Sequence, residues 1–391
     1  MGWRSGLALG AAAVVSAALA QTPRTLTRES GFWVQNAVGS LSAENAVRLR
    51  VTTAGNVVVR GGASKQVVYT LKRRIRARSA AEAAALARAC EVVGSNRSGL
   101  VQIAVRFPVS GTESADLSIT VPRALRQAWI ESLGGNVQAF DIDGDVETRT
   151  AAGKIQVDRV EESVARTGGG DITLGKIAGP VKCYSGGGNI RVERAGGESV
   201  IQTAGGEVFV HEVLGPIHIS TGGGNIKIGR SAAAVFAHTE GGLIQIDQAA
   251  GIVSAENSAG TIQVNAASGG VQCQSSGGAI HLHNVNGTLR AATTAGSIVA
   301  ELLAGHKMED SLLRTDTGDI TVFIPSNVAV RVVARNESAG SGRIISDFPE
   351  IRMQTVSAMG PALAEGVLNG GGPVLQLNVS AGTIYVRRLK Q

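Results

Sequence analysis

Residues 221–228 of the chain read TGGGNIKI, and residues 239–246 read TEGGLIQI. The second stretch repeats the first after 18 residues: a Thr, a pair of glycines, and two aliphatic residues separated by a polar one. The common pattern is G-x-[IV]-x-[apolar]. From Gly135 onward its Gly recurs in steps of 18, 17 and then seven times 18 residues, and further copies begin at Gly318 and Gly382. An internal period held this closely predicts a repeat architecture.

The columns of this repeat predict strands with one buried face. Ile, Val or Leu stands two and four residues after the Gly in nearly every copy, as in Ile226 and Ile228, and the residue between them is mostly polar. Such alternation is typical of a strand that packs one side on a core. A second apolar pair precedes the Gly, for example Ile217 and Ile219. Each repeat should therefore form one coil of two or three short strands.

A single coil cannot bury its own aliphatic face, so the coils must stack and turn each column into a ladder. We therefore predict an all-β fold, a single-stranded β-solenoid (β-helix-like) with 18-residue coils. A propeller fits less well because it needs about 40 residues per blade. An ordinary sandwich does not keep a fixed period.

A hydroxyl or amide side chain stands three residues before each Gly. Stacked side chains of this kind can hydrogen-bond along the solenoid axis and to the backbone of the turns. The column consists of Ser132, Thr150, Thr167, Ser185, Thr203, Thr221, Thr239, Asn257, Ser275, Thr293 and Thr315.

The three cysteines are not expected to form a disulfide. Cys183 and Cys273 occupy the same column, 90 residues or five coils apart. At roughly 4.8 Å per coil their separation is about 24 Å, whereas a disulfide needs Cα atoms within about 7 Å. Both cysteines should be buried core residues, and Cys90 should pair with neither.

The first twenty residues have the layout of a secretory signal peptide. Arg4 supplies a positive charge, residues 7–19 are apolar, and Ala18-Leu19-Ala20 forms a cleavage site. The apolar stretch is shorter than the roughly 20 residues that a membrane span needs. We expect a mature chain from Gln21 that is exported to the periplasm, the cell surface or the medium, with no integral membrane span after cleavage.

The period divides the chain into five parts. We predict a signal peptide over residues 1–20, a flexible segment over 21–44, and a β-rich N-terminal cap over 45–130 with a helix near 79–93. Solenoid repeats follow over 131–322, and capping strands over 323–391. Caps are expected because the ends of a solenoid expose open edges.

Charge and composition narrow the class of partner. The formal net charge is +6 and is not gathered in long runs, which weakly favours anionic partners. Export argues against nucleic acid. We expect a surface glycan or another envelope polymer as partner, and the oligomeric state stays open.

The pattern of polar residues does not favour catalysis, and we predict neither a catalytic residue nor a cofactor. Asp171, Glu207 and Asp319 share one outward column but stand two or more coils apart. A glycosidase-like site needs clustered carboxylates. His281 and His283 face the same side of one strand, which is more typical of solvated polar residues than of a metal site. The stretch Asp141–Asp145 resembles the start of a calcium loop but lacks the remaining ligands, so calcium binding is left open.

Several motifs together resemble the putative adhesin family of bacterial β-strand-repeat proteins, a domain of unknown function. Gly55–Val59 supplies an opening G-x-V-x-V, Val121-Pro122-Arg123 precedes the serial repeats, residues 315–325 close them, and Gly382 begins a last strand. The resemblance spans about residues 45–389 and implies a surface or envelope role. Its motifs are structural, so it implies no catalytic residues.

The leading hypothesis is a non-enzymatic adhesin or polymer-binding module of the cell envelope. Its candidate binding face consists of outward residues of the strand after each Gly: Arg191, Lys227, Gln245 and Gln263. A self-assembling scaffold solenoid is the alternative, and a carbohydrate-active β-helix enzyme is a less favoured one.

Overall fold

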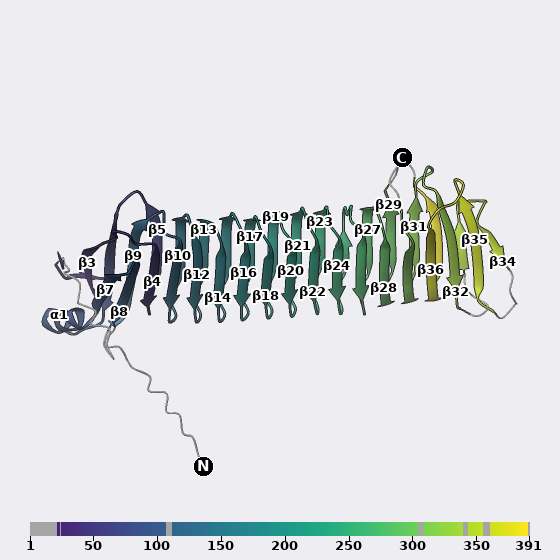
Figure 1. The fold of residues 1–391 in the computed structure, drawn as a ribbon. Coiled ribbons are helices and arrows are strands. Elements are labelled where there is room, and N and C mark those ends of the chain that lie inside the picture. Colours follow the sequence, from purple (N-terminus) through teal and green to yellow (C-terminus); the bar gives the residue numbers. More distant parts are fainter. Residues whose placement is uncertain are drawn as a thin grey trace, which may run out of the picture.

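The computed structural model describes residues 22–23, 25–106, 112–303, 308–338, 343–354 and 360–389. The predicted signal peptide, residues 1–20, lies outside this part of the chain. The described chain forms a long rod with α1 near one end and the C-terminal strands at the other (Figure 1). Among the described helices, none is long and apolar enough to cross a membrane.

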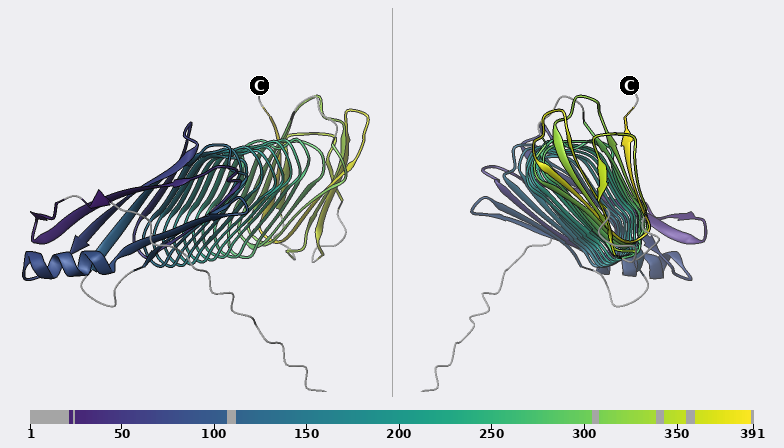
Figure 2. Two further views of the ribbon diagram at one scale, coloured as in Figure 1. Left: turned by 60° about the vertical axis from the view of Figure 1, so that its left-hand side comes forward. Right: turned by 90° about the vertical axis from the view of Figure 1, so that its right-hand side faces the viewer.

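Each central coil consists of two strands, one in each of two parallel sheets, which confirms the predicted solenoid. The flattened coils lie one behind another in Figure 2. We call the sheet of the strand before each turn sheet A and the other sheet B. Sheet A contains β10 (Gln127–Ser132), β12 (Asp145–Thr150), β14 (Ser163–Thr167), β16 (Val181–Ser185), β18 (Ser199–Thr203), β20 (Ile217–Thr221), β22 (Val235–Thr239), β24 (Val253–Asn257), β26 (Val271–Ser275), β28 (Leu289–Ala295) and β30 (Ser311–Thr317). Sheet B contains β11 (Val137–Ile142), β13 (Ile155–Val160), β15 (Ile172–Ile177), β17 (Ile190–Ala195), β19 (Val208–Val213), β21 (Ile226–Ser231), β23 (Ile244–Ala249), β25 (Ile262–Val264), β27 (Ile280–Val285), β29 (Ile298–Leu302) and β31 (Ile320–Ile324).

The core lies between the two sheets and is built from the repeated aliphatic columns. Ile226, Ile228 and Ile217 are fully buried, while Lys227 between the first two is exposed. Successive coils also pair through their backbones, as where the Ile226 N–H donates to the Leu243 carbonyl over 2.8 Å. Each buried CH₂ group stabilises the fold by about 0.8 kcal/mol. This contribution from every coil, together with the backbone hydrogen bonds between coils, drives the stacking.

The predicted hydroxyl column hydrogen-bonds along the axis as expected. Thr221 Oγ1 donates to the carbonyl of Gly206 in the preceding coil over 2.9 Å, and it accepts from the N–H of Gly224 in its own turn over 3.3 Å. Asn257 replaces the hydroxyl with both ends of its amide, donating to Gly242 and accepting from Gly260. In most coils the column therefore joins the turn to the one before it. We call it the turn ladder.

At the N-terminal end, one solenoid coil pairs on both of its sides with strands that come later in the chain. β4 (Arg48–Thr53) and β5 (Val57–Gly62) pair in parallel with β10 and β11 on one side. On the other side they pair with β8 (Leu100–Arg106) and β9 (Thr112–Pro122). Ser132 continues the turn ladder by donating to Gly55 over 2.8 Å. Residues 48–62, predicted as part of a separate cap, thus form a coil of the solenoid itself.

Antiparallel strands close this end. β6 (Gln66–Ile75) pairs with β9, and β7 (Glu91–Arg97) pairs with β8. The predicted helix forms as α1 (Ala80–Ala89), with Ser79 as its N-cap. It ends earlier than expected because Cys90 takes an extended conformation and the buried Val92 and Val93 belong to β7.

The segment predicted as flexible, residues 21–44, contains strands in its described part. β3 (Phe32–Ser42) pairs antiparallel with β6 over its whole length and buries Val34 and Ala37. The short strands β1 (Thr22–Pro23) and β2 (Thr27–Glu29) pair with β3 in turn. Half-buried side chains hold this segment on the edge of sheet B, a contact that the 18-residue period cannot indicate.

At the C-terminal end too, the last coil of the chain lies between two coils that precede it in the sequence. β36 (Val374–Ala381) and β37 (Thr383–Arg388) lie between β30 and β31 on one side and β32 (Val330–Asn336) and β33 (Arg343–Ser346) on the other. β35 (Ala362–Leu368) and β34 (Arg352–Gln354) then extend sheet A with antiparallel pairing. The isolated repeat predicted at Gly382 forms a coil, in which the Gly382 carbonyl accepts from Asn336 Nδ2 over 2.8 Å.

All three cysteines are free and buried, as the spacing predicted. Burial raises the pKa of Cys273 to about 12 and that of Cys183 still further. Both thiols therefore act as small apolar core groups.

Candidate binding faces

The predicted face lies on the outward side of sheet B, and the structure adds an aromatic residue to it. Arg191, Phe209 and Lys227 are register partners on the successive strands β17, β19 and β21, and Gln245 and Gln263 follow on β23 and β25. We call these five residues the sheet-B stripe. The guanidinium of Arg191 lies over the ring of Phe209, 4.4 Å from its centroid. Phe209 was not predicted, because the candidate face was defined by the polar residues of this column. An outward aromatic in a chain with 3% aromatic residues was the available signal.

The two halves of the sheet-B stripe differ in how firmly their side chains are held. Gln245 donates to Asp247 over 2.8 Å and Gln263 donates to Asn265 over 2.9 Å. Asn265 also donates to Asp247, which joins the two coils. Arg191 and Lys227 are exposed, and within the described residues neither forms an ion pair. The positive charge of the stripe is therefore concentrated around Phe209.

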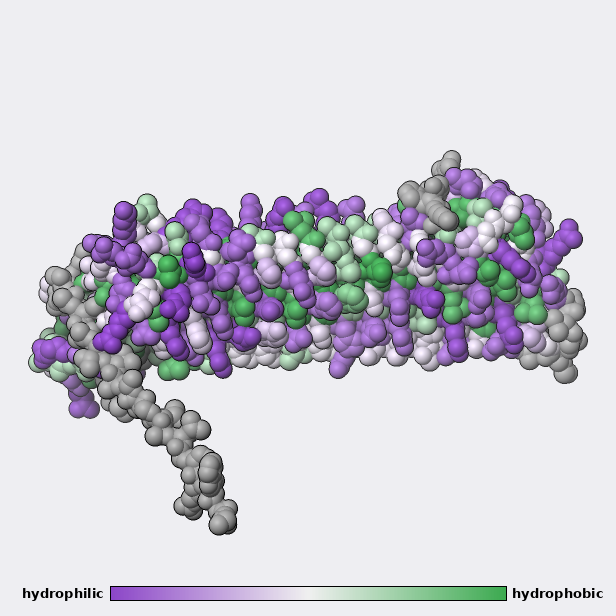
Figure 3. All heavy atoms as spheres, viewed as in Figure 1, coloured by the Kyte–Doolittle hydropathy of each residue, from purple (hydrophilic) through white to green (hydrophobic). Residues whose placement is uncertain are grey.

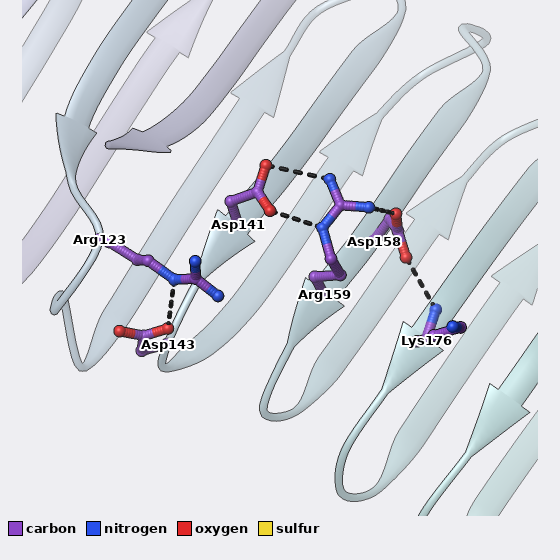
Figure 4. A network of polar contacts seen from close by, with 6 residues as sticks. All are labelled: Arg123, Asp141, Asp143, Asp158, Arg159 and Lys176. Atoms are coloured by element: carbon purple, nitrogen blue, oxygen red, sulfur yellow. Dashed lines mark hydrogen bonds and ion pairs between the residues drawn. The ribbon is translucent and has the colours of Figure 1, made fainter. Parts of the chain in front are cut away.

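Two carboxylates of the Asp141–Asp145 stretch form ion pairs with arginines. Asp141 accepts from Arg159 Nε over 2.5 Å and from Nη2 over 3.0 Å, and Asp143 accepts from Arg123 Nε over 2.8 Å (Figure 4). The hydrogen bonds from Arg159 are the largest cause of the lowered pKa of Asp141. Asp158 contacts Arg159 too, so arginines already occupy the carboxylates that a calcium ion would need.

The outward carboxylate column takes part in the turns. Asp171 Oδ1 accepts from the Asn189 N–H over 3.1 Å, and its other oxygen pairs with Lys154 Nζ over 2.9 Å. These contacts, led by Lys154, lower the pKa of Asp171. Asp319 accepts from the Thr383 N–H over 2.7 Å, and Glu207 accepts from Asn225 over 3.0 Å. The three carboxylates stay on separate coils and bond to the neighbouring coil.

The histidine pair has a carboxylate neighbour. His283 Nδ1 lies 3.2 Å from Glu301 Oε2 on the next coil. Burial, followed by the nearby His283, lowers the pKa of His281. Over the described ranges, no three His, Cys, Asp or Glu side chains are grouped so that they could hold a metal ion.

The outward side of sheet A contains a groove that the sequence analysis missed. It has a volume of about 540 Å³ and crosses four coils, where Glu131, Arg149, Arg166 and Tyr184 stand in register. Its end is formed by Leu133, whose surface is 70% exposed. We call it the sheet-A groove. A smaller hollow of about 280 Å³ lies further along the same face, where His218 and Phe236 stack at 4.4 Å.

Polar residues dominate the face of the rod drawn in Figure 3, with single hydrophobic residues among them. On this face (Figure 3) the hydrophobic residues are scattered among polar ones. Binding by the rod would therefore depend on short groups of residues such as the sheet-B stripe and the sheet-A groove.

No family model matches the sequence, and no curated protein matches it either. Among solved structures, the chain is similar to a protein described as a putative cell adhesion protein from Clostridium sporogenes, with 8% identity, a TM-score of 0.20, and coverage of 91% of this chain and 100% of that one. It is also similar to a putative adhesin from Parabacteroides merdae, with 7% identity, a TM-score of 0.26, and coverage of 70% and 95%. A putative adhesin from Bacteroides fragilis gives 11% identity, a TM-score of 0.20, and coverage of 90% and 97%. At these TM-scores the likenesses carry no argument about this chain.

Proposed function

We propose that this protein is an exported, non-enzymatic binding module whose sheet-B stripe holds anionic polymers of the cell envelope. The observation that carries the proposal is the position of Phe209 between Arg191 and Lys227 on three successive coils. Neither cation has a carboxylate partner among the described residues, so both can bind negative groups of a ligand. The aromatic ring adds an apolar contact between them.

The geometry of the solenoid suits an extended ligand. Successive coils place equivalent side chains about 4.8 Å apart along a straight axis. A linear polymer that lies along the axis can therefore contact Arg191, Phe209 and Lys227 with consecutive units, and then reach the fixed amides of Gln245 and Gln263. Because the cations are exposed, their attraction for an anionic chain should weaken as salt is added.

The predicted signal peptide and the resemblance to the putative adhesin family support a role outside the cytoplasm. The covered N-terminal end favours a single rod over the alternative of a scaffold that assembles end to end. At the N-terminal end, antiparallel strands cover both sheets of the outermost coil. Such strands reduce the open edge that another rod would need for pairing.

The proposal can be tested by measuring the binding of residues 21–391 to immobilised polygalacturonate, heparin and neutral dextran. We expect saturable binding to at least one of the two anionic polymers, with weaker binding at 0.5 M salt than at about 0.05 M. The double variant Arg191→Ala/Lys227→Ala should bind about tenfold more weakly, and Phe209→Ala several-fold more weakly.

Arg290→Ala is the matched control, because Arg290 is exposed on the outward side of sheet A and belongs to neither binding face. It removes a positive charge without touching the sheet-B stripe. Equal loss of binding in Arg290→Ala and in the double variant would show a nonspecific charge effect and would contradict the proposal. So would the absence of binding to both anionic polymers.

A further inference from the structure

We propose a second binding site on the opposite sheet: the sheet-A groove takes an uncharged glycan chain that lies along the rod axis. The inference goes beyond the proposed function, because it concerns another face, other residues and a ligand of different charge. It is based on the composition of the groove wall, where one aromatic ring stands beside planar charged groups whose charges balance.

The opposite charges in and beside the groove favour an uncharged ligand over an anionic one. Arg166 Nη1 pairs with Glu147 over 3.0 Å. Arg149 stands in register beside Glu131 on the neighbouring strand, so its charge also has a close opposite. In the sheet-B stripe, by contrast, no carboxylate stands in register with either cation on the neighbouring strands. An uncharged ligand meets no repulsion there, whereas an anion would meet Glu131 in the groove wall.

The functional groups of the groove match the hydroxyl groups of a sugar. A guanidinium presents several N–H donors in one plane, and a carboxylate presents two acceptor oxygens, so each can bond two adjacent hydroxyls of a ring. Arg149 is exposed and makes no hydrogen bond or ion pair with the described residues, so its donors are available. Glu131 is half-buried in the groove wall.

Tyr184 provides the flat apolar surface that a sugar ring needs. It is half-buried in the groove, and the guanidinium of Arg166 lies 5.1 Å from its ring centroid. The ion pair with Glu147 on one side and the ring on the other fix Arg166 in place, which reduces the entropy lost on binding. The C–H bonds on one side of a pyranose ring can pack on an aromatic face that is held in this way.

The dimensions fit a chain of several sugars. From β10 to β16 the groove crosses three intervals between coils, or about 14 Å at 4.8 Å per interval. Leu133 is the one large side chain at its corner position, because the equivalent residues of the next coils are Ala151, Gly168 and Gly186. The glycines cannot be enlarged, since a Cβ at Gly186 would lie 2.0 Å from the Gly168 carbonyl oxygen. Close packing of the coils therefore keeps these positions small, and the groove stays open beyond Leu133.

The test uses isothermal titration of residues 21–391 with neutral hexasaccharides of glucose, xylose, mannose and N-acetylglucosamine, and with a galacturonate hexamer as the acidic comparison. We expect at least one neutral hexasaccharide to bind and to be preferred over the acidic one. Tyr184→Ala should weaken that binding about tenfold, and Arg149→Ala roughly fivefold.

Tyr385→Ala is the matched control. Tyr385 lies on β37 of sheet B with Arg387 at 5.1 Å from its ring, so it repeats the Tyr184–Arg166 pair outside the groove. The melting temperatures of the variants check that each is folded. Binding of no neutral hexasaccharide, or equal binding by Tyr184→Ala and the unchanged protein, would overturn the inference. Loss of anionic binding in the Arg191→Ala/Lys227→Ala variant is measured separately and does not affect this result.

Discussion

The middle of the rod and its two ends follow different rules. From β12 to β29 each coil pairs with the coils that directly precede and follow it in the chain. At the ends, β4 and β5 lie between strands from two later segments, and β36 and β37 lie between two earlier ones. The comparison shows that an identical coil geometry can be reached by neighbouring or by distant segments. The stability of the ends therefore depends on long-range pairing.

Removing residues 374–391 should have the largest effect on this comparison. Without β36 and β37, the strands β30–β33 lose a parallel partner, while the central coils keep theirs. Because solenoid stability is close to a sum of nearest-neighbour terms, the loss should be local. Hydrogen exchange should show lost protection throughout β30–β33 and unchanged protection in β16–β24. A chain that lacks only residues 390–391 is the control, and retained protection in β30 and β31 would contradict the prediction.

Gly224→Ala tests the close contact between central coils. A Cβ there would lie 2.0 Å from the Gly206 carbonyl oxygen, whereas at the adjacent Gly223 it would meet nothing within 4 Å. We expect Gly224→Ala to lower the free energy of unfolding by about 3 kcal/mol and Gly223→Ala to change it by less than about 1 kcal/mol. Urea denaturation of both variants measures the difference. Similar values for the two would show that the coils can move apart easily.

Thr221→Val tests the turn ladder with little change of shape. The side chain is 1% exposed, and its loss leaves the Gly206 carbonyl and the Gly224 N–H without their partner. We expect a loss of about 2 kcal/mol in the free energy of unfolding. Thr221→Ser keeps the hydroxyl and should cost less than half as much. An equal cost for both would assign the effect to packing of the methyl group.

The smallest expected effect is that of acid, which should act differently on the middle of the rod and on its C-terminal end. Asp171 lies in the middle of the rod, and Asp347 lies at the C-terminal end, where it accepts from the Arg388 N–H over 3.1 Å and from Arg387 over 2.9 Å. The pKa of Asp347 is lowered, first by the Arg388 N–H and then by Arg387. A lowered pKa stabilises the fold above the ordinary pKa of Asp, and this contribution is lost as the pH falls through the lowered value.

In Asp347→Asn the acid-dependent loss of protection should therefore shrink in β33 and β37 and stay unchanged around Asp171. Hydrogen exchange between about pH 5 and pH 3 measures it, and an NMR titration should place both carboxyls below the ordinary pKa of Asp. An unchanged pH dependence at β33 and β37 would contradict the assignment.

The same contrast explains what could be predicted from the sequence. The period determines which residues are neighbours in the middle of the rod, so the buried columns, the turn ladder and the unpaired cysteines followed from spacing alone. At the ends the period stops, and the sequence carries no local signal for which segments pair. The insertion of β4 and β5 and the pairing of β3 with β6 were missed for this reason.

The candidate faces were predicted only in part. Alternation identified Arg191 and Lys227 as outward residues, and their register confirmed that they share one side. Phe209 was missed because a single apolar residue in an outward, mostly polar column looks like an exception to the repeat pattern. The sheet-A groove depends on how far the side chains of Leu133 and Tyr184 project past their small neighbours. The repeat pattern gives the position of each residue in a coil but not this projection.

The inserted C-terminal coil has a consequence for how the protein is made. The chain is synthesised from its N-terminus, so β32 and β33 are complete before β36 and β37, which lie closer to the middle of the rod. The position between the outer strands and β31 is filled only by these last residues. A chain that stops before residue 374 leaves unpaired strand edges on both sides of this position, and such edges are available to proteases and to other chains. The final coil thus provides the parallel partners that both neighbouring coils need at this end of the rod.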